Sequence, residues 1–462
     1  MSNHPNELLY PLDSRPGAVE SAFAAIQHVL ASFVGIITPT LIVGGVLGLG
    51  EHIPYLISMA LMVSGVATFI QARRPMGIGT GMICVQGTSF AFLSSVLAAG
   101  FVAKGQGGGP EEILAMIFGV CFLGAFVEIF LSQFLHKLKT VITPLVTGIV
   151  ITIIGVSLIK VGMTDLAGGF KAPDFGSPGN LMLGGLVLVS IIAMNRSSNS
   201  WIRLSSIVLG LAIGFIVAAF MGKISFSNLA NLPLISIPVP FKYGFSFDWT
   251  AFLPISLIYL ITAIESTGDI TANCIVSRQP IKGDSYIQRV KGGVLADGLN
   301  SMLAALFNSM PNTTFSQNNG VIQLTGVASR HIGYYIAAIL FVLGMFPVIG
   351  GVLQNIPKPV LGGATLVMFG TVAAAGIKIL ATEHLDRRKM LIMAVAFGMG
   401  LGAMMVPDVL SQMPKLVQSI FGSAITTGGL AAIILSAVLP ETKAVAAAEE
   451  PSADETAEAQ AS

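Results

Sequence analysis

Residues 257–274 read LIYLITAIESTGDITANC, and this stretch indicates which class of protein the chain forms. It lies in an apolar segment long enough to cross a bilayer, for which about 20 residues are needed. It also carries Glu265 and Asp269, which are four positions apart and therefore share one face of a helix. A charge at the bilayer centre costs at least about 2.5 kcal/mol, so these acids predict a functional site inside a membrane protein.

Apolar segments of similar length recur along the chain and predict about fourteen membrane spans. Their expected bounds are 18–47, 53–70, 77–101, 113–135, 141–161, 181–194, 202–221, 252–275, 293–307, 315–327, 332–353, 360–380, 390–406 and 416–439. The sequence therefore predicts an all-α polytopic membrane protein. Its membrane domain would cover residues 18–440, between an N-terminal tail (1–17) and a C-terminal tail (441–462) whose Ala- and Glu-rich composition predicts disorder.

The overall composition supports this class. Apolar residues make up 53% of the chain and charged residues only 10%, against roughly a quarter in soluble domains. The formal net charge of +1 and the absence of a basic patch argue against a nucleic-acid partner. The three cysteines, Cys84, Cys121 and Cys274, are scattered and form no CxxC pair, so neither a metal site nor a disulfide framework is predicted.

Lysine and arginine placement predicts the orientation of the chain in the membrane. Basic residues gather in the even-numbered loops between the predicted spans, at 73–74, 137–139, 196–203, 278–291, 330 and 378–389. Because cytoplasmic loops carry the excess of basic residues, both termini are predicted to be cytoplasmic.

A spacing shared by two distant segments predicts an internal repeat. The pattern P-x3-G-x6-G begins at Pro144 and again at Pro359, in the fifth and twelfth predicted spans. A separation of seven spans places the two copies in opposite orientations, which is the mark of an inverted repeat. We expect two seven-span repeats, at approximately 18–221 and 249–440.

Two predicted spans contain polar runs that interrupt a helix. Residues 85–90 read VQGTSF in the third span, and residues 316–326 read SQNNGVIQLTG in the tenth, shortly after Pro311. Irregular backbone is tolerated in a membrane only where protein or a water-filled cavity satisfies its polar groups. Interrupted segments at corresponding positions of two halves are a sequence pointer to a binding site.

Three further polar residues lie in apolar segments. Asp297 follows in the ninth span, within GGVLADGLN, so three acids fall in two adjacent spans. His28 in the first span is interpreted first as a hydrogen-bonded core residue and second as a proton carrier. Glu128 in the fourth span lies toward Lys137–Lys139 and is interpreted as a structural residue close to a loop.

These side chains suit a planar ligand rich in amide groups. Gln317 and Asn318 each offer donors and acceptors. An ionised Glu265 could accept two N–H groups from one ring edge, and Phe90 could stack on the ring face. A half-helix beginning after Gly320 would direct backbone N–H groups at a carbonyl oxygen.

The sequence resembles the nucleobase–ascorbate transporter family, and within it the bacterial xanthine permeases. The family signature, roughly [QEP]-N-x-G-x4-T-[GRK], is matched in order by residues 317–326, QNNGVIQLTG. The stretches ESTGDITA (265–272) and KGGVLADGLN (291–300) resemble the family's eighth- and ninth-span motifs, and the pair Gln27–His28 resembles one in its first span. The resemblance covers nearly the whole chain between the tails.

The resemblance implies a transporter with core and gate domains, short extended pieces in spans three and ten, and an elevator-like motion within a homodimer. It implies proton-coupled uptake of a nucleobase across a bacterial inner membrane, with the proton as coupling ion and no cofactor or metal. The implied roles are substrate contact for Glu265 and Gln317, stacking for Phe90 with Ser89 beside it, selectivity for Asn318, an essential function for Asp297, and tuning of affinity or proton coupling for Asp269 and His28.

The resemblance also bears on the substrate. Gln at the first signature position, here Gln317, goes with xanthine and urate in this family, whereas Glu goes with uracil. Ser89 is at a position that varies among members, so xanthine and urate both remain open. An anion exchanger or channel on a related fold is the alternative, but it would need a cation or a bare helix N-terminus where this chain has acids. An enzyme is disfavoured, because the chain has no HExxH or GxSxG motif.

Overall fold

The computed structural model describes residues 8–135, 143–169, 172–224 and 232–440. The predicted disordered tail at 441–462 and the basic residues 137–139 lie outside these ranges. The first half contains α1 (Ala18–Leu47), η1 (Gly50–His52), α2 (Ile53–Arg73), η2 (Pro75–Gly77), β1 (Gln86–Thr88), η3 (Phe90–Phe92), α3 (Leu93–Gly105), α4 (Pro110–Phe134), α5 (Pro144–Leu166), α6 (Pro178–Asn195), α7 (Ser200–Leu204) and α8 (Ser206–Phe220). The second half contains α9 (Trp249–Val276), α10 (Asp284–Leu306), β2 (Asn312–Thr314), α11 (Gln317–Thr325), α12 (Arg330–Gly344), α13 (Pro347–Gln354), α14 (Lys358–Leu380), α15 (Arg387–Met405), η4 (Pro407–Leu410), α16 (Lys415–Phe421) and α17 (Ala424–Val438).

The long helices confirm the class of all-α polytopic membrane protein. Eight helices of the described ranges are long and apolar enough to cross a bilayer, or up to ten if each of two bent pairs counts as one span. The bent pairs are α12 with α13, at 73°, and α16 with α17, at 78°. The remaining predicted spans correspond to the shorter helices α3, α8 and α11 and to α10, which is 23 residues long but is not among the helices counted above. The total of about fourteen and the inverted-repeat arrangement therefore stay predictions.

The two interrupted spans each contain an extended piece followed by a helix. In the third, the run VQGTSF forms β1 as expected, and η3 and α3 follow. In the tenth, our expectation was wrong in detail: the extended piece is β2, upstream of the polar run, and α11 begins at Gln317 rather than after Gly320. Pro311 and the β-branched pair Thr313 and Thr314 favour extended backbone directly before the polar run, and the polar run itself then supplies the first turn of the helix.

The two extended pieces pair with each other in the interior. Strands β1 and β2 are antiparallel, with Gln86 opposite Thr314 and Thr88 opposite Asn312. The pairing continues at both ends, where the N–H of Ser89 donates to the carbonyl of Pro311 (2.8 Å) and the N–H of Phe315 donates to that of Val85 (2.9 Å). These bonds satisfy backbone groups that a bilayer interior would otherwise leave unpaired.

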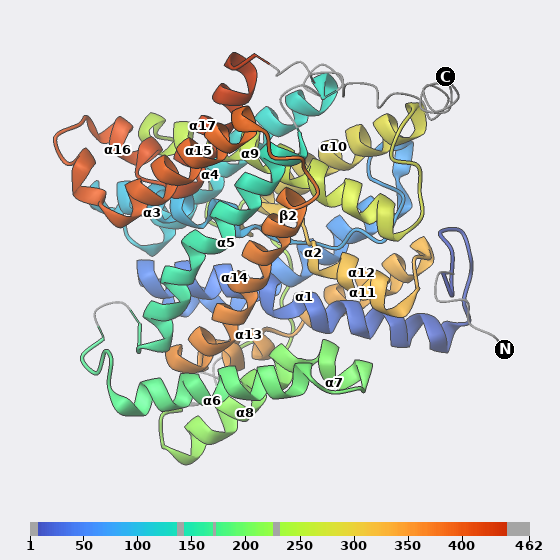
Figure 1. The fold of residues 1–462 in the computed structure, drawn as a ribbon. Coiled ribbons are helices and arrows are strands. Elements are labelled where there is room, and N and C mark those ends of the chain that lie inside the picture. The colour runs from blue at the N-terminus through green and yellow to red at the C-terminus, as the bar shows by residue number, and fades with distance from the viewer. Residues whose placement is uncertain (1–7, 136–142, 170–171, 225–231, 441–462) are drawn as a thin grey trace, which may run out of the picture.

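Helices α5 and α14 run side by side along their length (Figure 1), and glycines allow their backbones to touch. A Cβ atom added at Gly155 would lie 2.2 Å from the backbone nitrogen of Ala373, and one added at Gly376 would lie 2.4 Å from that of Thr152. By contrast, no heavy atom lies within 4 Å of a Cβ added at Gly370. The glycines of the repeated pattern therefore do not have equivalent surroundings in the two helices.

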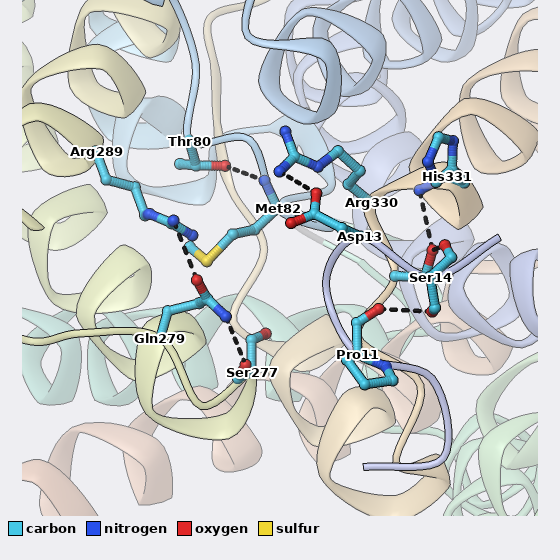
Figure 2. Close-up of polar contacts among 11 residues, drawn as sticks. Pro11, Asp13, Ser14, Thr80, Met82, Ser277, Gln279, Arg289, Arg330 and His331 are labelled. Carbon is cyan, nitrogen blue, oxygen red and sulfur yellow. Dashed lines mark hydrogen bonds and ion pairs between the residues drawn. The ribbon is translucent and has the colours of Figure 1, made fainter. Parts of the chain in front are cut away.

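The N-terminal segment is attached to the chain that follows α11. The N–H of Tyr10 donates to the carbonyl of Gly326 (3.2 Å), and the N–H of Arg330 donates to that of Leu12 (2.9 Å). Figure 2 shows the ion pair between Asp13 and Arg330, at the start of α12. Residues 10–14 are thus an ordered strap that meets the helix bearing the polar signature at its C-terminal end.

Candidate functional site

Asp297 is the most enclosed of the three predicted acids. It is fully buried in the middle of α10. Its carboxylate accepts hydrogen bonds from the hydroxyl of Ser266 in α9 and from Nε2 of Gln71 in α2 (3.3 Å). The other end of the Gln71 amide accepts from the N–H of Thr80 (3.0 Å). The carboxylate of Asp297 therefore links three helices, α2, α9 and α10.

Asp269 joins α9 to the second interrupted segment. Its carboxylate accepts from the hydroxyl of Thr314 in β2 (3.0 Å). Its backbone carbonyl accepts from the side-chain amide of Asn319 in α11 (3.2 Å). These two bonds fix β2 and the first turn of α11 against the acidic face of α9.

Glu265 and Gln317 are the open groups of the site. Glu265 lies one turn before Asp269 on the same face of α9 and is partly exposed, and within the described ranges its buried Oε2 atom has no hydrogen-bond partner. Gln317 is the first residue of α11 and is also partly exposed. A carboxylate oxygen without a partner and an amide at a helix N-terminus are groups that a polar ligand can satisfy.

The first interrupted segment borders the site next to α5 and α14. Ser89 is buried, and its hydroxyl has no partner among the described residues. The ring of Phe90 meets Phe369 of α14 edge to face, with centroids 5.1 Å apart. A Cβ added at Gly268 of α9 would lie 2.2 Å from a methyl carbon of Thr147 in α5. The α5–α14 pair therefore packs directly against the elements that carry the predicted contacts.

His28 and Asn318 form a buried pair. The amide of Asn318 donates to the backbone carbonyl of His28 (3.2 Å), and its nitrogen lies 2.9 Å from Nδ1 of the imidazole ring. In the described structure neither Nε2 of His28 nor Oδ1 of Asn318 has a partner. The pair connects α1 with α11 and reaches the acids only through the neighbouring Asn319.

The predicted residues thus lie on α9, α10, α11 and α1 and on the start of η3, just after β1, and the sequence analysis missed several of their neighbours. Gln71, Ser266 and Thr314 donate hydrogen bonds to the acids, and polar side chains within or beside apolar segments were the signal that could have found them. Glu128, interpreted from the sequence as a structural residue close to a loop, is buried in the last third of α4, with 1% of its surface exposed, and its role stays a prediction. The face of α4 that carries Glu128 is directed inward, toward α9 and α10.

The three acids of the site have no basic partner among the described residues. None of the four ion pairs between described residues involves Glu265, Asp269 or Asp297. Within the same ranges, no group of three His, Cys, Asp or Glu side chains is placed to hold a metal ion. The acids are therefore held by neutral hydrogen-bond donors.

Comparison with known structures shows the fold. The chain is similar to the transmembrane domain of a cyanobacterial bicarbonate transporter, BicA, with a TM-score of 0.55 and 14% identity over 90% of this chain and 96% of that one. It is also similar to the murine solute carrier 26 family member A9 anion transporter, with a TM-score of 0.59 and 12% identity over 92% of this chain and 68% of that one. At these identities the likeness concerns the fold alone.

Comparison with known sequences identifies the family. Xanthine permease XanP of Escherichia coli is 45% identical over 95% of this chain and 96% of its own length. Xanthine permease XanQ of the same organism is 46% identical over 94% of each chain, and a xanthine permease of Bacillus subtilis is 35% identical over 92% of this chain and 94% of its own. These relatives are named as transporters rather than enzymes, as predicted. The model Xan_ur_permease, described as "Permease family", matches residues 19–409, and the chain belongs to that family of nucleobase–ascorbate transporters.

Proposed function

We propose that this permease takes up xanthine together with a proton by alternating access. The observation that carries the proposal is the free Oε2 atom of Glu265, which lies on the face of α9 that Asp269 ties to α11 and hence to Gln317. The names of the relatives that match over almost the entire chain support xanthine as the substrate. Urate and uracil are the alternatives within the family.

The chemistry of a dioxopurine suits these groups. Its ring edge presents N–H donors to a carboxylate, and its carbonyl oxygens accept from an amide or from helix N–H groups. We propose that Glu265 accepts from the ring, that Gln317 and the N-terminal turn of α11 donate to a carbonyl, and that Phe90 contacts the ring face. Ser89 and Asn318 would then influence which purine fits.

Proton coupling is supported by acids that have no basic partner among the described residues. A buried carboxylate without a cation is favoured in its neutral form, so such a group can gain and lose a proton as its surroundings change. Asp297, Asp269 and His28 are the further candidates for this role. We also propose that the elements bearing the site move as a core against a gate containing α5 and α14, in a homodimer in the bacterial inner membrane with both termini cytoplasmic.

The decisive experiment is uptake of radiolabelled xanthine into cells that express this chain. We expect accumulation that collapses on addition of a protonophore and that excess unlabelled xanthine, but not uracil, suppresses. Competition by urate and guanine defines the purine range. A flux of bicarbonate or sulfate without xanthine uptake would contradict the proposal and favour the anion transport for which the fold neighbours are named.

The variant Glu265→Gln tests the central contact. Because it exchanges a charge-assisted acceptor for a neutral amide, we expect a loss of roughly 10- to 150-fold in uptake, corresponding to about 1.5–3 kcal/mol. The matched control is Glu112→Gln, which removes an exposed carboxylate from the first turn of α4. Normal uptake by Glu265→Gln at equal abundance in the membrane would refute the assignment.

A further inference from the structure

Glu128 is a buried acid for which the family signature and the proposed contacts give no role. It lies in the last third of α4 with 1% of its surface exposed. Both of its carboxylate oxygens are buried, and neither has a hydrogen-bond partner within the described structure. An unpaired carboxylate in such a position is unfavourable for folding, so a purely structural role gives no reason for an acid here.

Close helix packing places Glu128 beside the acids of the site. A Cβ added at Gly298 of α10 would lie 2.9 Å from the backbone nitrogen of Ile129 and 3.3 Å from the carbonyl oxygen of Ala125. The backbones of α4 and α10 therefore touch immediately beside Glu128 and Asp297. Helix α9 also packs on α4, because the hydroxyl of Tyr259 in α9 donates to the carbonyl of Cys121 in α4 (2.9 Å).

The titratable groups around Glu128 are almost all acidic. Asp297 from α10 and Glu265 from α9 both act on its carboxyl group electrostatically. The same carboxyl group acts on the buried phenol of Tyr259. Helix α3 also packs on α4, and its basic residue is Lys104, exposed in its last turn. The segment 241–246 packs on α4 as well, and its Lys242 interacts with Glu111 in the first turn of α4, at the opposite end from Glu128. With no described cation nearby, the charge on one of these three carboxyl groups depends on the charge on the other two.

We propose that Glu128 is a proton-binding group of the coupling site, linked to substrate binding through Asp297 and Glu265. This inference rests on the proposed function. When the substrate's N–H groups stabilise an ionised Glu265, the negative charge favours retention of a proton on a carboxylate oxygen of Glu128. Glu265 stays ionised when the substrate leaves on the other side of the membrane; water then enters and screens its charge, and Glu128 releases its proton there. The empty carrier returns without that proton, so one proton crosses with each substrate.

The test compares accumulation with exchange in Glu128→Gln, which keeps the shape of the side chain and removes the proton site. We expect uphill accumulation of xanthine driven by a proton gradient to fall at least tenfold, and its dependence on external pH to flatten. Exchange of external labelled for internal unlabelled xanthine needs no net proton movement and should stay within about twofold of the wild type. Glu112→Gln on the same helix is the control and should change neither readout.

The outcomes separate this inference from the proposed function. If the wild type takes up no xanthine, the proposed function fails; if it does and Glu128→Gln accumulates xanthine equally well, only the role of Glu128 is overturned. Loss of exchange as well as accumulation would also overturn it, since binding would then be affected. If Glu128→Gln does not reach the membrane, Glu128→Asp should restore accumulation with a shifted pH profile, and an unshifted profile would overturn the inference.

Discussion

The site around α9 and the α5–α14 pair touch each other but are built on opposite principles. Around α9, buried acids and amides are held by hydrogen bonds between distant segments, and atoms such as Oε2 of Glu265 have no partner among the described residues. Along α5 and α14, glycines bring two backbones together, and the ion pair that the two helices share, Asp165 with Lys358 (3.6 Å), lies at the end of α5 and the start of α14. The first region has free polar groups for a ligand, and the second offers a regular, close-packed surface. The difference indicates that binding chemistry and mechanical support are assigned to separate helices.

The largest effect that would sharpen this comparison is expected from Asp297→Asn. The change keeps the size of the side chain but weakens the bonds from Ser266 and Gln71, which are charge-assisted when the acid is ionised. We expect xanthine uptake to fall roughly 10- to 150-fold, on the basis of about 1.5–3 kcal/mol for hydrogen bonds to charged groups. Uptake is measured at matched membrane abundance. Wild-type rates in this variant would mean that the acid merely fills space, and the contrast between the two regions would disappear.

A smaller effect, on stability rather than transport, is expected from Gly376→Ala. Its Cβ would lie 2.4 Å from the backbone nitrogen of Thr152, so the helices must separate, at a cost of about 1–3 kcal/mol. Gly370→Ala in the same helix meets no neighbour and should gain up to about 1 kcal/mol from helix propensity. The readout is Tm of the purified protein in detergent. Equal Tm values for the two variants would show that the close approach of α5 and α14 is unimportant for stability.

The smallest effect concerns the N-terminus of α9, which lies outside the bilayer-spanning part of the site. Asp248 caps this helix, accepting from the N–H of Thr250 (2.7 Å) and from its hydroxyl, and the Thr250 hydroxyl bond is the main cause that holds the pKa of Asp248 below its ordinary value. Asp248→Ala should lower stability by about 1 kcal/mol at neutral pH.

The pH dependence of this cap has a definite sign. Because the folded-state pKa is depressed, the charged contribution of Asp248 is present above the ordinary value of 3.8 and is lost as the pH falls through the lower, folded-state value. The Tm difference between Asp248→Ala and the wild type should therefore shrink in acid. Asp248→Asn, which retains a capping oxygen, should remain close to the wild type in neutral buffer, and a deficit as large as that of the alanine variant would contradict a capping role.

Sequence patterns predicted the helical membrane class and indicated the candidate site residues. The spacing of Glu265 and Asp269, the polar signature at Gln317 and the run VQGTSF are local features, because helix periodicity and interruption can be read within one segment. The helical, multi-pass class followed from composition. Those features required no knowledge of which segments are neighbours.

The rest depended on contacts between segments distant in the sequence. The packing of whole helices against each other decides that Gln71 and Ser266 donate to one carboxylate. It also decides that the part of α4 carrying Glu128 touches α10. The start of α11 at Gln317 depends on the strand β2 just before it. Hydropathy treats α3 and α11 as ordinary spans, although each begins only after an extended stretch.

The pairing of β1 with β2 has a consequence for how the protein is made. The two strands come from opposite halves of the chain, yet each provides the hydrogen-bond partners of the other. While the second half is still being synthesised, the backbone of β1 has no such partner in the membrane interior, where unpaired groups are costly. Insertion of the first half alone should therefore be incomplete around Gln86–Thr88, and a ribosome-bound or truncated chain would depend on water, lipid headgroups or an insertase to shield this segment until β2 arrives.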